Sequence, residues 1–498
     1  MFQTILPRGR SRRAMQMRTL LLVLLCPAML AQSKNPEIAP IAKPQSSAPS
    51  GVISEITPEE VAEQQHYNQP LRPQFHYTAL QGHIGDATGL FFYRGEYHLF
   101  NIYDEWARKS SVHKRWGHAI STDLIHWTQM PPVLDTTIDH SPGSGSGVVD
   151  WNNSSDLRNG PDKTVLIFYT DYKKGSCILY SNDRGRSWVR YEGNPILPGF
   201  EDIRDPNVFW YSAAKEWRMV RYEKKGFAFY GSSDLLHWRW LSRVEGFYEC
   251  PDLFELAVDN SPSEFRWVLV DGDGSYVIGQ FDGTRFVAES PRLRAEYGTA
   301  LYATQTWKIS SLSSRPIQIA WLKYPQQSTL TWDGQMSFPV ELSLRRLPEG
   351  MRLIRQPISA IRELCTSQRT WRTFAMTAEE VPGLELELLD LSLVMGSKGA
   401  TEFGLRIHGQ EIRYSTKEQM LYMDSASAPL ALEGGQLRLR ILVDRSSLEV
   451  FALPGAVSIS TVTLTHAGEP ITLISRGGRA TVVSLLANSL NPIWPLHR

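Results

Sequence analysis

The sequence predicts an all-β protein, a five-bladed β-propeller followed by a C-terminal β-sandwich. From about Phe75 to residue 345, short apolar and aromatic runs are broken by Gly, Asp, Asn and Pro, with few helical periodicities. This texture is typical of many short strands. Further on, apolar and polar residues alternate strictly, as in Leu384–Leu388 and Leu437–Ile441. Such alternation indicates the half-buried strands of a sandwich.

A repeated turn motif indicates the propeller. Ser121–Trp127 recurs as Ser232–Trp238, with a related copy at Ser181–Trp188 and a weaker one at Phe281–Phe286. The copies lie roughly 50 to 60 residues apart, which is the spacing of propeller blades. In each turn we expect the Asp to accept backbone N–H bonds and the Trp to pack beneath it, so the motif is structural. About 270 residues at this spacing correspond to five blades.

The N-terminus predicts export. Five arginines precede an apolar run from Leu20 to Leu30, which is too short to span a bilayer but suits a signal peptide. We expect a secreted or periplasmic protein, with a lipid anchor at Cys26 as a variant. The expected domains are a signal peptide at 1–31, a Pro/Ser/Ala-rich linker at 32–75, the propeller at 76–345, a connector at 346–366 and the sandwich at 367–498.

Charge and cysteine content exclude several classes of partner. The chain has 52 basic and 52 acidic residues, so no charge surplus favours nucleic acid or an anionic membrane. Its four cysteines are widely spaced, without a disulfide framework or metal-ligand spacing. We therefore expect no cofactor, no metal and no integral membrane segment after the signal. The oligomeric state is left open.

Three acidic segments interrupt the structural repeat. They are His83–Leu90, Glu201–Asn207 and Tyr248–Asp252, and each lies at the beginning or end of an expected inner strand. Inner strands line a propeller's central channel. Three carboxylates that converge there can hydrolyse a glycoside: one attacks, one protonates the leaving oxygen and one stabilises the transition state. Any one segment alone is better explained by a turn or a surface ion pair than by catalysis.

The order and spacing of these segments resemble glycoside hydrolase family 32, the β-fructosidases of the invertase, levanase and inulinase kind, from about residue 76 to 485. Gly85–Gly89 stands where the family has its nucleophile turn. Arg204–Pro206 matches the family's Arg-Asp-Pro motif, and Glu249–Pro251 matches its Glu-Cys motif. Val443–Phe451 resembles a strand pair of the family's sandwich.

This resemblance implies a retaining glycoside hydrolase that cleaves β-fructofuranosidic bonds in sucrose, inulin, levan or a related fructoside by double displacement. Asp86 would be the nucleophile, Glu249 the acid/base and Asp205 the transition-state stabiliser. Arg204 would keep Asp205 ionised. The resemblance also implies substrate contacts from Arg204, Trp116, Ser144, His118, Ile102, Glu296 and Trp332.

The sequence departs from the family around the nucleophile. Gly85 and Ile102 replace an Asn and a Gln whose side chains form hydrogen bonds, so we expect an altered substrate preference. Asn101 or Asp104 could fill the vacated space. Three alternatives stay open: a related five-bladed arabinanase or xylosidase, a sialidase, and a non-catalytic or weakly active carbohydrate-binding protein derived from the fold.

Overall fold

The computed structural model describes residues 67–105, 114–135, 140–199, 202–308, 315–324, 331–375, 387–463 and 470–494. All of them belong to one compact unit. They form strands almost throughout, and the 3-10 helix η1 (Ser359–Leu364) is a short exception. The all-β prediction is therefore confirmed. The expected signal peptide and Cys26 lie outside the described residues. No helix in the described ranges is both long and apolar enough to cross a membrane.

Within these ranges, residues 82–357 form five sheets, which we call blades. Blade 1 contains β21 (Trp332–Asp333), β1 (Gly82–Tyr93), β2 (Glu96–Asp104), β3 (Arg115–Ser121) and β4 (Thr128–Asp135). Blade 2 contains β5 (Pro142–Asp150), β6 (Thr164–Asp171), β7 (Gly175–Ser181), β8 (Val189–Arg190) and β9 (Leu197–Pro198). Blade 3 contains β10 (Ile203–Tyr211), β11 (Glu216–Glu223), β12 (Gly226–Ser232) and β13 (Arg239–Glu245).

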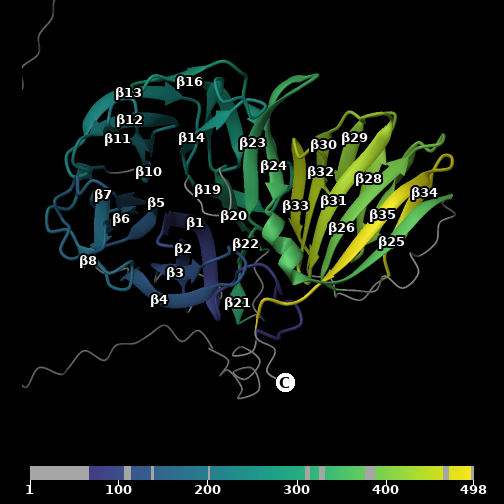
Figure 1. The fold of residues 1–498 in the computed structure, drawn as a ribbon, viewed down its shortest axis with the longest axis horizontal. Coiled ribbons are helices and arrows are strands. Elements are labelled where there is room, and N and C mark those ends of the chain that lie inside the picture. The colour runs from purple at the N-terminus through teal and green to yellow at the C-terminus, as the bar shows by residue number, and fades with distance from the viewer. Residues whose placement is uncertain are drawn as a thin grey trace, which may run out of the picture. The chain divides into compact units, whose positions relative to one another are not determined.

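Blade 4 contains β14 (Asp252–Ala257), β15 (Phe265–Val270), β16 (Ser275–Phe281), β17 (Phe286–Ala288) and β18 (Leu293–Arg294). Blade 5 contains β19 (Leu301–Trp307), β20 (Ile317–Leu322), β22 (Gln335–Met336), β23 (Val340–Leu347) and β24 (Gly350–Pro357). The inner strands β1, β5, β10, β14 and β19 gather around the centre of the propeller (Figure 1). Here β1 contacts β5 and β19, and β5 contacts β10.

The remaining strands form the two sheets of the sandwich, coloured green to yellow in Figure 1. One sheet has the order β25 (Cys365–Ala375), β35 (Thr481–Leu490), β26 (Leu389–Gly396), β31 (Gln436–Asp444), β32 (Ser447–Ala452), β33 (Val457–Val462). The other has the order β30 (Ala426–Pro429), β29 (Met420–Met423), β28 (Gln410–Ser415), β27 (Glu402–Ile407), β34 (Thr472–Arg476). Their inward-facing apolar residues form one continuous core.

The repeated turn motif is structural, as predicted. Asp123 Oδ1 accepts hydrogen bonds from the backbone N–H groups of Ile125 at 2.9 Å and His126 at 2.8 Å. Asp234 accepts the equivalent bonds in its own turn, at the same two distances. These carboxylates are therefore committed to closing turns between strands.

Two expected boundaries differ from the structure. β24 pairs along its whole length with β23, so blade 5 continues to Pro357 and the connector shortens to the η1 region. Residues 67–75 of the expected linker are largely packed: Arg72 and Gln74 are buried, and the backbone N–H of Gln74 donates to Asp444 at 2.8 Å. This packing could not be predicted from the sequence, because it depends on polar residues whose partners lie far away in the chain.

Candidate active site

The three predicted carboxylates lie together at the beginnings of inner strands. Asp86 is in β1, Asp205 is in β10 and Glu249 directly precedes β14. Their negative charges interact, since Asp86 and Glu249 both raise the pKa of Asp205. The three carboxylates that the sequence motifs indicated are therefore close enough in the structure for their charges to interact.

Irregular backbone at the same level of the blades brings these side chains together. Strand pairing shifts between Ile84 and Ala87 in β1, and between Arg204 and Asn207 in β10. Similar shifts flank Ser144 in β5 and follow Tyr302 in β19. β-bulges of this kind redirect side chains out of the regular alternation. Asp205 and Glu249 also have positive φ angles, of 59° and 53°, a conformation that is uncommon for residues other than glycine.

The Asp86 carboxylate is held by Ser144 of the adjacent inner strand, β5. The Ser144 hydroxyl donates a hydrogen bond of 2.7 Å to Asp86 Oδ2. Burial raises the pKa of Asp86; the Ser144 bond opposes this rise and the charge of Glu249 adds to it. Ser144, predicted to contact substrate, therefore lies beside the expected nucleophile.

The pKa of the Asp205 carboxyl is strongly raised. Burial raises its pKa to about 7, opposed by a hydrogen bond of 3.0 Å that the Cys250 backbone N–H donates to Oδ2. Arg204 lowers the pKa of Asp205, as expected, but burial outweighs this effect. Arg204 Nε lies 3.9 Å from Asp205 Oδ2, whereas its Nη2 lies 2.8 Å from Glu249 Oε1.

Glu249 is oriented from both sides. Arg204 donates to Oε1 from Nε at 3.1 Å and from Nη2 at 2.8 Å. Tyr302 donates its hydroxyl to Oε2. Arg204 is in turn held by Asp202 at 2.8 Å and stacks over the ring of Tyr222 at 4.4 Å. This arrangement fixes the orientation of the Glu249 carboxylate.

Three of the expected substrate contacts are buried inside the blades instead. Trp116 is fully buried and donates Nε1 to the Gly143 carbonyl at 3.0 Å. His118 is 1% exposed and stacks on Phe100, and Trp332 is 1% exposed beneath Arg72. None of the three presents surface to a sugar, so they act by packing the blades that carry the site.

Glu296 also lies away from the carboxylates, at the contact between propeller and sandwich. It is 3% exposed and forms an ion pair of 2.8 Å with Arg355. Its carboxylate also accepts hydrogen bonds from the hydroxyl of Ser458 at 2.6 Å and the backbone N–H of Ser460 at 2.7 Å. All of its hydrogen-bonding capacity serves this contact, so the structure gives no support to a sugar-binding role.

Ile102 and Gly85 do border the site. A Cβ atom on Gly85, next to Asp86, would lie 3.5 Å from Cβ of Ile102. Asn101 and Asp104, which could have filled this space, are only 1% and 2% exposed. The glycine at position 85 therefore leaves room for a side chain beside Asp86, in ordinary contact with Ile102 and His83.

Sequence reasoning missed Tyr302, Tyr172 and Trp321. Tyr302 bonds Glu249, and Trp321 is paired with it on β20. The Tyr172 ring is 47% exposed and covers Gly143, where a Cβ would lie 2.7 Å from it. No motif marks these residues. Their positions near the site become evident only when the blades are assembled around the channel.

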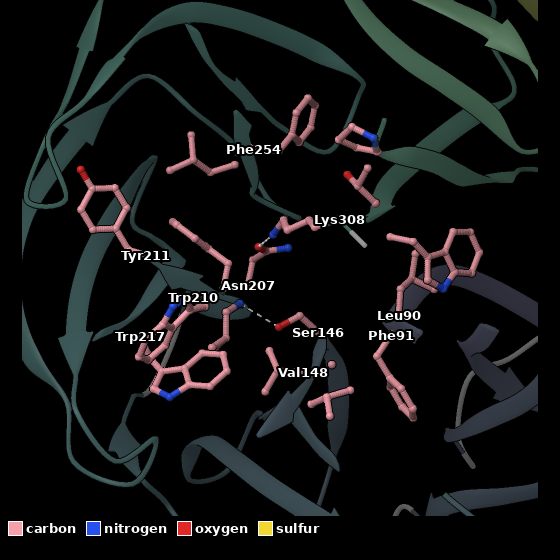
Figure 2. Close-up of a pocket in the computed structure, with 18 of the residues that line it drawn as sticks. Leu90, Phe91, Ser146, Val148, Asn207, Trp210, Tyr211, Trp217, Phe254 and Lys308 are labelled. Atoms are coloured by element: carbon pink, nitrogen blue, oxygen red, sulfur yellow. Dashed lines mark hydrogen bonds between the residues drawn. The ribbon is translucent and has the colours of Figure 1, made fainter. Parts of the chain in front are cut away.

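Two further layers follow the carboxylates along the inner strands. Two or three residues after the carboxylates come the buried polar side chains of Thr88, Asn207 and Asp252, and Ser146 is buried two residues after Ser144. Beyond them is an aromatic-lined cavity of about 580 Å³. Figure 2 shows it surrounded by Trp210, Tyr211, Trp217 and Phe254, with Lys308 bonded to Asn207 at 2.6 Å. The cavity is thus at the opposite end of the channel from the carboxylates.

Comparison with known proteins identifies the family and the fold. Residues 76–357 match the N-terminal domain of the glycosyl hydrolases of family 32, and residues 358–489 match the C-terminal domain of that family. The chain is 31% identical to a levanase of Bacillus subtilis, over 87% of this chain and 72% of the levanase. It is 27% identical to an extracellular exo-inulinase of Aspergillus ficuum, over 86% and 96% of the two chains. The solved exo-inulinase of Aspergillus awamori has the same fold, with a TM-score of 0.77 at 24% identity, covering 86% of this chain and all of that one.

Proposed function

The chain belongs to family 32 of the glycosyl hydrolases, and from that premise we propose that it is a retaining β-fructofuranosidase acting on a fructan, sucrose or a related fructoside. The observation that supports this most strongly is the convergence of Asp86, Asp205 and Glu249 at the starts of three inner strands. Relatives named levanase, exo-inulinase and invertase support the substrate class.

In the proposed reaction Asp86 attacks the anomeric carbon and forms a glycosyl ester, while Glu249 gives its proton to the leaving oxygen. Ser144 orients Asp86 by its hydrogen bond. The charge of the transition state is stabilised by Asp205 in its ionised form, which predominates above its pKa of about 7. Water then enters, Glu249 takes its proton, and the ester is hydrolysed with net retention.

We also propose that the protein is exported. The apolar run at Leu20–Leu30 has the pattern of a signal peptide, and the exo-inulinase relatives are named as extracellular. A lipid anchor at Cys26 remains a variant of this proposal. Immunoblots of culture medium, periplasm and membranes, with and without Cys26→Ala, distinguish the two routes.

The replacement of an Asn and a Gln by Gly85 and Ile102 beside Asp86 favours a changed substrate preference within this class. Gly85 and Ile102 cannot form the side-chain hydrogen bonds of Asn and Gln, each of which contributes about 0.5–1.5 kcal/mol net. Losing two costs roughly one to two orders of magnitude in rate if they strengthen at the transition state. We therefore expect weak activity on sucrose and higher activity on another fructoside.

Kinetics on sucrose, inulin, levan and substituted fructosides test this proposal. Wild type is compared with the double variant Gly85→Asn, Ile102→Gln, which the ordinary contact distances at Gly85 allow. We expect the double variant to gain on sucrose and to lose on the preferred substrate of the wild type. A wild type that cleaves sucrose as well as any other fructoside contradicts the altered preference. Absence of cleavage of every fructoside contradicts the enzymatic proposal itself and favours the carbohydrate-binding alternative.

A further inference from the structure

The space that Gly85 leaves beside Asp86 is not imposed by the backbone. The φ angle of Gly85 lies outside the left-handed region, and the modest distances around its missing Cβ would accommodate a side chain. Glycine is therefore not needed here for chain geometry. What the absence of a side chain provides is space at the residue that precedes the proposed nucleophile.

The polar group that faces this space is the imidazole of His83. A Cβ on Gly85 would lie 3.6 Å from His83 Nε2, as close as it would lie to Ile102. The His83 side chain is 26% exposed, so a ligand can reach it. Among the described residues, none forms a hydrogen bond with Nε2.

Asp333 fixes the orientation of this ring. His83 pairs with Asp333 across the parallel strands β1 and β21, and Nδ1 lies 3.1 Å from Asp333 Oδ2. An ionised carboxylate only accepts hydrogen bonds, so Nδ1 carries the proton of this bond, and in that tautomer the Nε2 atom facing the space has a lone pair that can accept a hydrogen bond. The ring also packs edge-on against Trp321, at 5.7 Å between centroids.

We infer that His83 is a specificity-determining residue: its Nε2 accepts a hydrogen bond from one hydroxyl of the bound fructosyl unit, in the space over Gly85. This inference rests on the proposed function and deepens it. Gly85 and Ile102 provide no hydrogen-bonding group, and Asn101 and Asp104 are buried. His83 supplies the missing polar contact from a different strand position. The preferred substrate is then a fructoside whose hydroxyl reaches this side of the site.

The test is a thermodynamic cycle between His83 and the substrate hydroxyls. The variants are His83→Leu, which removes the acceptor, and His83→Gln, which keeps one. The substrates are the best fructoside of the wild type and its four analogues that lack the 1-, 3-, 4- or 6-hydroxyl of the fructosyl unit. We expect kcat/KM of the wild type to fall by roughly 2- to 12-fold on the analogue that lacks the His83 partner, the range of one neutral hydrogen bond.

On the parent substrate, His83→Leu should lower kcat/KM by a similar factor. On the analogue that lacks the His83 partner, His83→Leu should have the same kcat/KM as wild type. His83→Gln should restore most of the discrimination. If His83→Leu lowers kcat/KM by the same factor on the parent and on every analogue, or changes nothing, the inference is overturned. A wild type inactive on all fructosides would instead refute the proposed function, so the two failures are distinguishable.

Discussion

At the residue scale, Arg204 shows that adjacency in sequence does not decide which carboxylate a cation contacts most closely. Arg204 and Asp205 are adjacent in the chain, which predicts that Arg204 keeps Asp205 ionised, yet Arg204 lies closer to Glu249. Consecutive side chains on a strand point to opposite faces, and Asp205 is further redirected by its positive φ. Arg204 therefore reaches Glu249, 45 residues away, while Asp205 binds the Cys250 backbone. The identities of the carboxylates could be predicted, but their partners could not.

The pair of bonds at Glu249 leads to a test of its acid role. Glu249→Gln cannot protonate a leaving oxygen, so kcat/KM on fructosides with poor alcohol leaving groups should fall by about 10²–10⁴. Activated aryl fructosides need no proton and should lose far less in the first step. Glu255→Gln, the same change at an exposed position on β14, serves as the matched control. Equal loss on both substrate classes would argue against the acid role.

At the element scale, the strands could be predicted more readily than their irregularities. Alternation and the repeated turn predict blades and sandwich. The bulges in β1, β5, β10 and β19 depend on backbone conformations, several of them adopted by residues other than glycine. For the same reason motif position did not show which face a residue occupies. Trp116 and His118 stand in a motif near the site, yet both point into the blade core.

The segment that precedes β1 is fastened to the sandwich strands by a buried histidine. His76 Nδ1 lies 2.7 Å from Asp444 Oδ2, and Nε2 lies 2.7 Å from Glu449 Oε1. Both partners are carboxylates, so both nitrogens donate when the ring is protonated. Burial opposes this charge, but the two hydrogen bonds outweigh it and raise the pKa of His76 from 6.5 to about 9.

This cluster predicts a specific dependence of stability on pH. Because the pKa of His76 is raised in the folded state, its contribution is complete below pH 6.5 and is lost as the pH rises through about 9. The rise corresponds to roughly 3 kcal/mol. The Tm of His76→Gln should therefore be lower than that of wild type at pH 6, and the gap should narrow toward pH 9.5. His126→Gln, at an exposed histidine, is the matched control, and a gap independent of pH would refute the assignment.

At the scale of the whole molecule, the channel is divided into the carboxylate site at one end and the aromatic-lined cavity at the other. The buried polar layer between them is closed by bonds such as Ser146 Oγ to the Pro206 carbonyl at 2.9 Å and Thr88 Oγ1 to the Gly145 carbonyl at 2.7 Å. The sandwich contacts the propeller and the segment before it through Glu296 and His76, and Glu296, which was predicted to bind sugar, belongs to this contact instead.

The central claim is that Asp86 and Glu249 act in a double displacement. It is tested most directly by running the reaction in dilute methanol and identifying the methyl fructoside by NMR. A glycosyl ester on Asp86 is attacked from the face that the leaving group left, so the account predicts methyl β-fructofuranoside, formed by wild type and absent with Asp86→Asn. Methyl α-fructofuranoside, the product of inversion, or undiminished product from Asp86→Asn would contradict it.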